Sequence, residues 1–170
     1  LREQSEVGTN VLDAGAIELL TPRDPWHTSA VLHDWFALLE AGYRLAPVAA
    51  SHSSWLELDQ PGAARTVVLT ESELVEDRLL TLARGRTVAT SGPSLEVLLH
   101  APSGSAGPGE TLDVQAGETI ELELHLRAAD WVPVDRVRVF MGGEEIWSTE
   151  VQAAGPTDYS ETIRLLCPGD

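Results

Sequence analysis

The sequence predicts an α/β layer followed by an all-β antiparallel sandwich, and two observations support this division. Residues 1–92 alternate short apolar runs with stretches whose apolar residues recur at helical spacing. After Ser91-Gly92-Pro93 the apolar residues instead recur at every second position, which is typical of strands with one buried face. We therefore place a domain boundary near Gly92 and predict an α/β portion over residues 1–92 and a sandwich over 93–170.

The first three predicted elements are a strand, a helix and a second strand. Ala16–Leu20 is a short apolar strand, and Thr28 suits the N-cap of a helix that runs to about Ala41 and ends at Gly42. The apolar residues of this helix form one stripe, namely Val31, Leu32, Trp35, Leu38 and Leu39. Leu45–Ala50 follows as a strand without charged residues, as expected when both faces of a strand are covered.

A second unit of strand, helix and strand completes the first half. Arg65–Thr70 is the strand, and Thr70 and Glu73 fit a capping box, in which both side chains satisfy free N–H groups of the first helical turn. The helix is expected to stop at Gly85 and to bury four apolar residues, Leu74, Val75, Leu79 and Leu82. Arg86–Thr90 is the last strand. The order β-α-β-β-α-β indicates an α/β layer or part of a barrel.

The second half consists of short strands separated by turns. Alternation is strictest from Ile120 to Arg127, where apolar residues alternate with charged residues and a histidine. Gly142-Gly143 predicts a two-residue hairpin turn, and Ser103–Glu110 predicts a loop rich in Gly, Ser and Pro. The other predicted strands are Leu95–His100, Val137–Met141, Ile146–Val151 and Tyr159–Leu166. Short strands without helices predict an Ig-like antiparallel sandwich.

Composition excludes several classes of function. The chain has 27 acidic and 11 basic residues, a formal charge of −16, so its surface repels phosphate backbones and nucleic-acid binding is disfavoured. No apolar run approaches the roughly 20 residues of a membrane span, and no signal peptide is recognisable. Cys167 is the only cysteine, so no internal disulfide is expected.

Residues 43–54 are the most informative stretch for function. They read Tyr-Arg-Leu-Ala-Pro-Val-Ala-Ala-Ser-His-Ser-Ser, a buried strand that runs into a loop of small polar residues. Because sites in α/β sheets form at strand ends, His52 is a candidate metal or ligand contact, and a hydrogen-bonded structural histidine is the alternative. Ser51, Ser53 and Ser54 are candidate cleft residues. No Gly-x-Ser-x-Gly elbow surrounds them, which favours a role as turn residues over a role as nucleophiles.

Four further residues are candidates for the same cleft. His27, in a Pro-rich stretch, is a second candidate metal ligand or an exposed loop histidine. Glu18 and Asp24 are a candidate carboxylate pair, although Glu18 is as easily a structural strand residue. Trp55 either flanks a ligand cleft or seals the interface between the two halves. No two of the five histidines stand at i, i+2 or i, i+4, so there is no zinc signature.

Several short pieces stand in an order that is similar to a known family. They are Ala16-Ile17-Glu18, Trp35 to Gly42, Val48–Ser54, Arg65-Thr66-Val67, Gly85-Arg86 and Ser91-Gly92-Pro93. In this order they resemble the C-terminal part of the polymerase-and-histidinol-phosphatase (PHP) metallohydrolases, in the CehA/McbA-like branch. Asp130-Trp131 and Val134-Asp135-Arg136-Val137 resemble the β-sandwich that follows in that family.

The resemblance implies a fold and an activity. Residues 1–92 would be the C-terminal portion of a PHP-like α/β barrel, followed by an Ig-like sandwich. The activity would be metal-dependent hydrolysis, usually of phosphoesters, and members of the family are often secreted or periplasmic. Where the family's last metal loop has a Ser-Asp-Ser-His-like motif, this chain has Ser51-His52-Ser53-Ser54, and the family's other ligands would lie upstream of Leu1.

This departure from the motif leaves three hypotheses. In the first, the chain is a piece of a hydrolase, inactive alone, and a second chain carrying the N-terminal PHP half completes the site for Zn, Mn or Fe. In the second, it is a non-catalytic binding protein that uses the sandwich and needs no cofactor. In the third, open strand edges and apolar helix faces make it a homo-oligomeric scaffold.

Overall fold

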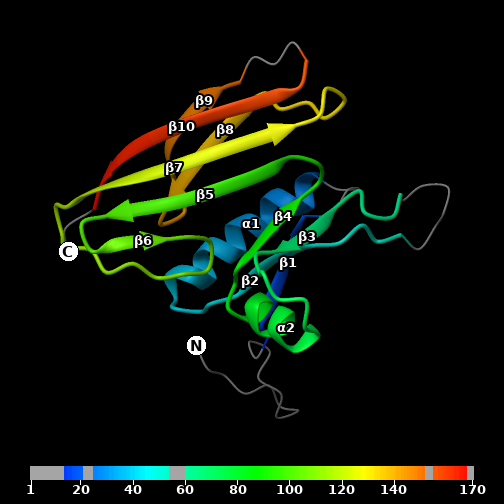
Figure 1. The fold of residues 1–170 in the computed structure, drawn as a ribbon, viewed down its shortest axis with the longest axis horizontal. Helices are drawn as coiled ribbons and strands as arrows, with labels where there is room; N and C mark the ends of the chain where they lie inside the picture. The colour runs from blue at the N-terminus through cyan, green and yellow to red at the C-terminus, as the bar shows by residue number, and fades with distance from the viewer. Residues whose placement is uncertain (1–13, 21–24, 54–59, 152–154, 168–170) are drawn as a thin grey trace.

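The computed structural model describes residues 14–20, 25–53, 60–151 and 155–167. Within these ranges the chain forms ten strands and two helices, and most of its regular structure is β. Figure 1 shows the strands of the second half as a long sheet beside a smaller group of strands and helices from the first half. The described residues contain no helix that is long and apolar enough to cross a membrane.

The first half follows the predicted order of elements. These are β1 (Ala16–Leu20), α1 (Pro25–Glu40), β2 (Ala46–Ala49), β3 (Arg65–Val68), α2 (Val75–Ala83) and β4 (Thr87–Thr90). Strands β1 and β2 pair in parallel, whereas β3 and β4 pair antiparallel although a helix connects them. Within the described residues, the strands of the α/β portion therefore form two separate pairs, the parallel pair β1–β2 and the antiparallel pair β3–β4.

Threonine side chains connect these two pairs of strands. The backbone N–H of Ala49 in β2 donates to Thr66 Oγ1 in β3 (2.9 Å), and that hydroxyl donates to the carbonyl of Ala49 (3.0 Å). Thr87 Oγ1 in β4 donates to the carbonyl of Pro47 (2.8 Å). Since proline has no N–H to offer a neighbouring strand, these side chains take the place of ladder hydrogen bonds along β2.

Helix α1 begins four residues earlier than a cap at Thr28 predicts. Its first residue is Pro25, so Thr28 lies inside the helix and is not its cap. Proline is favoured at the first helical position because its fixed φ suits the helix and its missing N–H has no partner there. The helix ends as predicted, with Gly42 at a φ of 85°. Trp35 Nε1 donates to the carbonyl of Leu45 (3.0 Å) and so holds α1 against the entry to β2.

Helix α2 differs from the prediction in its cap and in its burial. Thr70 and Glu73 form no capping box, because the helix begins after Leu74, whose N–H is 3.3 Å from Ser72 Oγ. The helix buries none of its residues. Leu74, Val75 and Leu79 are 62–63% exposed, so the expectation that they are core residues is wrong. Its end at Gly85 is as predicted, with the glycine N–H donating to the carbonyl of Leu82 (2.8 Å).

The second half is all-β and antiparallel, as predicted. Four strands form one sheet in the order β10-β7-β5-β6, and two more form the hairpin β8–β9. The bounds are β5 (Ser94–Ala101), β6 (Gly104–Ala106), β7 (Thr119–Ala128), β8 (Arg136–Met141), β9 (Glu144–Glu150) and β10 (Thr157–Leu166). Strand β6 lies in the segment predicted as a loop. Gly142 and Gly143 form the predicted hairpin turn, with φ of 55° and 76°.

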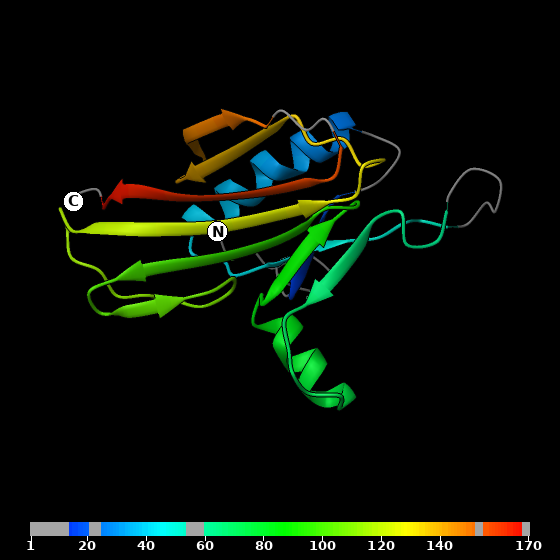
Figure 2. The same ribbon diagram turned by 45° about the horizontal axis from the view of Figure 1, so that its top comes forward.

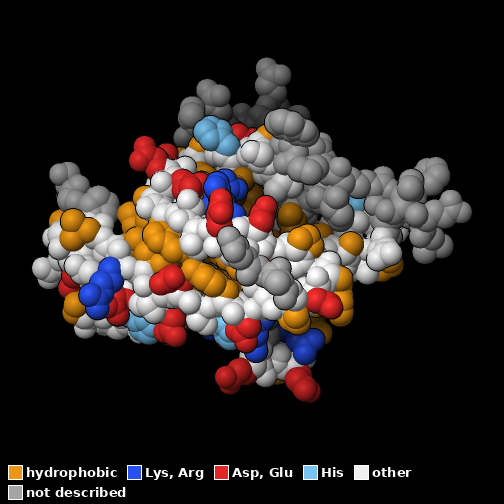
Figure 3. Space-filling view, turned by 90° about the horizontal axis from the view of Figure 1, so that it is seen from above, with side chains coloured by type: hydrophobic (Ala, Val, Ile, Leu, Met, Phe, Trp, Pro, Cys, Tyr) orange, Lys and Arg blue, Asp and Glu red, His pale blue; other side chains and the backbone are white. Residues whose placement is uncertain are grey.

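The long sheet has one buried and one exposed face. Along β7, Ile120, Leu124 and Leu126 are buried, and the alternate side chains form ion pairs across strands on the outer face. The hairpin β8–β9 lies behind this sheet in Figure 1 and above β10 in Figure 2, as a separate layer with α1 next to it. Trp131, in the segment between β7 and β8, is 82% exposed. Figure 3 shows acidic groups scattered over one face and not gathered into a patch.

The two halves contact each other at several points. The rings of Phe36 in α1 and Phe140 in β8 are 5.3 Å apart between centroids. Gly109, in the loop after β6, lies against the backbone of Gly85 so closely that a Cβ on Gly109 would stand 2.4 Å from the Gly85 carbonyl carbon. The predicted boundary near Gly92 thus falls between β4 and β5 in a chain whose two halves are packed together.

Candidate site at the ends of two parallel strands

The predicted cleft residues that the structure describes lie around the parallel pair β1–β2. Glu18 of β1 is paired with Val48 of β2, so the carboxyl ends of both strands point to the same edge. The segment that follows β2 carries Ser51, His52 and Ser53. Parallel pairing is therefore what brings residues from positions 18 and 51–53 of the chain to one place.

His52 and Glu18 are in direct contact. His52 Nε2 is 2.5 Å from Glu18 Oε1, and the two side chains are 56% and 32% exposed. A carboxylate accepts hydrogen bonds, so Nε2 is the donor and carries a proton in this contact. Glu18 therefore fixes the orientation of the imidazole through this contact.

The backbone at His52 is unusual. Its φ is 49°, and it is the one non-glycine residue with positive φ in the ranges that the structure describes. Histidine adopts this left-handed region more readily than most residues, yet it still costs about 1–2 kcal/mol relative to ordinary backbone. Backbone strain of this kind is concentrated at functional sites, where the surrounding structure maintains it.

The serines next to His52 interact with each other. Ser51 Oγ and Ser53 Oγ are 2.8 Å apart, a hydrogen bond between residues two apart in the loop. Such local bonds are typical of turn residues. The contact supports their interpretation as loop-shaping side chains and gives no indication of an activated nucleophile.

Four predicted site residues cannot be placed in this arrangement. Asp24, Ser54 and Trp55 lie outside the described residues. The backbone of His27 belongs to the first turn of α1, but its side chain is outside the description. Their participation in the cleft remains a prediction from the sequence.

Two other histidines also contact carboxylates, in a different setting. His100 Nε2 is 3.2 Å from Glu123 and His125 Nε2 is 2.7 Å from Asp158. Both pairs join neighbouring strands on the exposed face of the four-stranded sheet. Cross-strand pairs of this kind stabilise a sheet face, whereas the pair at His52 joins a strand to the loop at the end of its neighbour.

The chemistry of His52 and Glu18 suits one corner of a metal site. An imidazole nitrogen is a ligand for Zn, Mn or Fe, and a carboxylate that holds the other ring nitrogen is the usual second partner of a metal-bound histidine. A metal needs at least three or four such ligands. Among the described residues there is no group of three His, Cys, Asp or Glu side chains that is able to hold a metal ion. These residues alone do not complete a site.

Sequence reasoning missed a concave region at the open end of the β8–β9 hairpin. This region is an open pocket of about 610 Å³, lined by Asp135, Arg136, Arg138, Glu150 and Val151. The alternation of arginines on β8 was visible in the sequence as a polar strand face. The pairing of Arg136 with Glu150 depends on the register of the hairpin, including the irregularity between Val139 and Phe140.

Comparison of the chain with protein-family models, with curated proteins and with solved structures finds no match.

Proposed function

We propose that this chain is one part of a PHP-like, metal-dependent hydrolase of the phosphoesterase type, in which residues 1–92 supply one corner of the metal site. In this proposal the imidazole of His52 is the ligand, and Glu18 is the carboxylate that orients it. The observation that supports it best is the 2.5 Å contact between Glu18 and His52 at the ends of two parallel strands.

The strained backbone of His52 and the order of the elements add to this support. His52 has a φ of 49°, a backbone conformation that is kept mainly where the surrounding structure maintains it. Its side-chain partner, Glu18, comes from the neighbouring strand β1. The order β-α-β-β-α-β followed by antiparallel strands is the order that the resemblance to the CehA/McbA-like branch implies. In that interpretation the second half is an Ig-like sandwich.

The chain's own residues have limited roles in such a reaction. Glu18 accepts the hydrogen bond from Nε2 and fixes the ring, and His52 presents its imidazole to the ion. The bound divalent ion would supply Lewis-acid chemistry for hydrolysis. Because these residues give one ligand, we propose that the chain is inactive alone and that a second chain, or another part of the same protein, supplies the remaining ligands.

Metal binding tests this assignment. We expect the isolated chain to bind at most one Zn²⁺ or Mn²⁺ per molecule in calorimetry, with a weak Kd of about 0.1–1 mM. The variant His52→Ala should abolish this binding. Glu18→Gln should weaken it by about 10-fold, because the imidazole loses its orienting partner. His125→Ala, which removes a histidine from a carboxylate contact of similar length, is the matched control and should change nothing.

Two results would contradict the proposal. Tight binding of two or three metal ions by the isolated chain, with hydrolysis of p-nitrophenyl phosphate, would show that it is a complete enzyme. Binding that survives in His52→Ala would place the metal elsewhere.

A further inference from the structure

We propose that the pocket at the open end of the β8–β9 hairpin binds a small zwitterion, an α-amino acid with free amino and carboxylate groups. Arg136 and Arg138 would bind the carboxylate, and Glu150 and Asp135 would bind the ammonium group. The proposal concerns a part of the molecule that the metal site does not use, and it stands independently of the hydrolase proposal.

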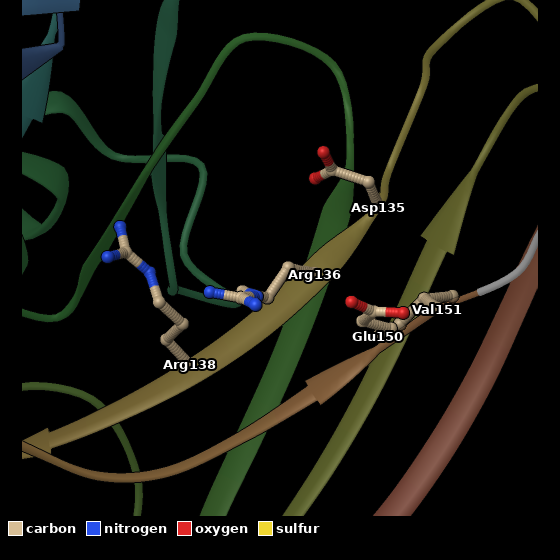
Figure 4. A pocket seen from close by; sticks show the side chains of 5 residues that line it. All are labelled: Asp135, Arg136, Arg138, Glu150 and Val151. Carbon is tan, nitrogen blue, oxygen red and sulfur yellow. The ribbon is translucent and has the colours of Figure 1, made fainter.

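The pocket presents charges of both signs from two neighbouring strands. Arg136 and Arg138 are two residues apart on β8, so both side chains leave the same face of the strand. Glu150 of β9 stands directly opposite Arg136 in the ladder. Asp135 is the residue directly before Arg136. Figure 4 shows the two guanidinium groups and the two carboxylates around one space, with Val151 at its edge.

Arg136 is available for a ligand. All eleven basic residues of the chain are arginines, and most of those described hold their guanidinium groups against another residue. These tethered arginines are Arg44, Arg65, Arg78, Arg86, Arg127 and Arg164. Within the described residues the guanidinium group of Arg136 has no hydrogen bond or ion pair, and the same holds for the guanidinium group of Arg84 at the end of α2. Although Glu150 faces Arg136 across the ladder, the two do not form an ion pair.

Arg138 is held in place without losing its donors. Its guanidinium carbon lies 5.2 Å from the centre of the Phe140 ring, and Nη1 is 3.7 Å from Glu145. A guanidinium that lies over an aromatic ring keeps its N–H groups in the plane free for hydrogen bonds. Phe140 is fixed in turn by Phe36 of α1. Arg138 is therefore a positioned second donor beside the unpaired Arg136.

The balance of charge selects the ligand class. Two guanidinium groups alone would favour any anion, because their forks match carboxylate and phosphate oxygens. Glu150 and Asp135 beside them, in a chain with a charge of −16, repel a purely anionic ligand. A ligand that carries an ammonium group next to its carboxylate satisfies both pairs, and Val151 offers an apolar wall for its side chain.

Three probes that differ in charge test the proposal. L-leucine carries both charges, N-acetyl-L-leucine only the carboxylate, and L-leucinamide only the ammonium group. We expect L-leucine to shift the backbone amide signals of Arg136, Glu150 and Val151 in an NMR titration, with an affinity about 10-fold above that of either other probe.

Variants of the pocket separate charge from geometry. Arg136→Gln and Glu150→Gln should each weaken L-leucine binding by about 10-fold or more. Arg136→Lys keeps the charge but loses the fork, and should also weaken it. Arg164→Gln removes an arginine from the outer face of β10 and should leave the affinity unchanged. The dispersion of the amide spectrum shows whether each variant is folded.

Several outcomes would overturn the proposal. N-acetyl-L-leucine binding as tightly as L-leucine would show a simple anion site, in which Glu150 has no role. Binding of L-leucine that survives Arg136→Gln in a folded variant, or no shift at millimolar L-leucine, would show that the pocket is not a zwitterion site.

Discussion

At the scale of single residues, two buried threonines differ in whether their hydroxyl has a partner. Thr87 is 3% exposed and donates to the carbonyl of Pro47. Thr157, at the start of β10, is 5% exposed, and its Oγ1 has no partner within the described residues. A buried hydroxyl without a hydrogen bond opposes folding. Removing a buried hydroxyl that donates a hydrogen bond instead leaves its acceptor unsatisfied.

The two threonines should therefore respond oppositely to the same substitution. We expect Thr87→Val to lower the free energy of unfolding by about 1–3 kcal/mol, because the Pro47 carbonyl loses its donor. Thr157→Val should raise it by up to about 1 kcal/mol, because a methyl group replaces an unsatisfied hydroxyl. Urea denaturation measures both, with the exposed Thr162→Val as control. Changes of the same sign at both sites would contradict this account.

Tyr159 makes a contribution to the free energy of unfolding that is lost at alkaline pH. Desolvation by partial burial, together with the hydrogen bond to Glu161 and its negative charge, raises the pKa of this phenol above the ordinary value of 10.0. The folded state thus holds the proton more tightly than the unfolded chain. This contribution is fully present below pH 10 and is lost as the pH rises through the pKa of the folded state.

We expect Tyr159→Phe to flatten the alkaline part of the stability profile. The free energy of unfolding, measured in urea between pH 8 and pH 11, should fall less steeply above about pH 10 in this variant. Tyr43→Phe is the control for removing a phenol. An equally steep fall in Tyr159→Phe would assign the alkaline loss to other groups.

The candidate site was predictable in its members but not in its contacts. Glu18 and His52 stand out in the sequence because each lies at or near the end of an apolar strand. Their contact depends on β1 and β2 being parallel neighbours, which hydrophobic periodicity does not determine. The positive φ of His52 was not predictable either, because histidine, although enriched at positive φ, still adopts negative φ at most positions.

At the scale of elements, helix α2 shows what periodicity leaves open. Its apolar residues have helical spacing, and the helix forms where the sequence predicts it. Spacing indicates that a helix has an apolar stripe, but it does not say whether another element covers that stripe. In this chain the stripe stays exposed at Leu74, Val75 and Leu79. The capping box does not form because the helix begins only after Leu74. The hydroxyls of Thr70 and Ser72 accept from the N–H groups of Ser72 and Leu74, which precede the helix.

Helix α1 and the β8–β9 hairpin should stabilise each other through Phe36 and Phe140. Their rings are 5.3 Å apart and tilted by 34°, a geometry that contributes about 0.5–1.5 kcal/mol beyond burial. We expect a double-mutant cycle with Phe36→Ala and Phe140→Ala to give a coupling energy in this range. Phe36→Ala combined with Leu79→Ala, a residue on the exposed face of α2, should be additive. Additivity of the two phenylalanines would show that the ring contact does not stabilise the fold.

At the scale of the whole molecule, the division into two halves describes the sequence better than it describes the packing. The change of period near Gly92 coincides with the place after which the described residues form strands and no helix. The aromatic contact between α1 and β8, and the hydrogen bond from Arg44 to Thr111 (3.3 Å), cross that boundary. Such contacts arise from the way elements meet in space, and no local pattern of residues encodes them.

The close approach of Gly109 and Gly85 has a consequence for how this sequence is able to change over time. Position 109 has a φ of 78° and has no room for a side chain, because backbone atoms of the other half occupy that space. Its neighbours Pro108 and Glu110 lie in the same loop without that restriction. Position 109 should thus remain glycine, and the substitutions that either half tolerates there would depend on the shape of the other half.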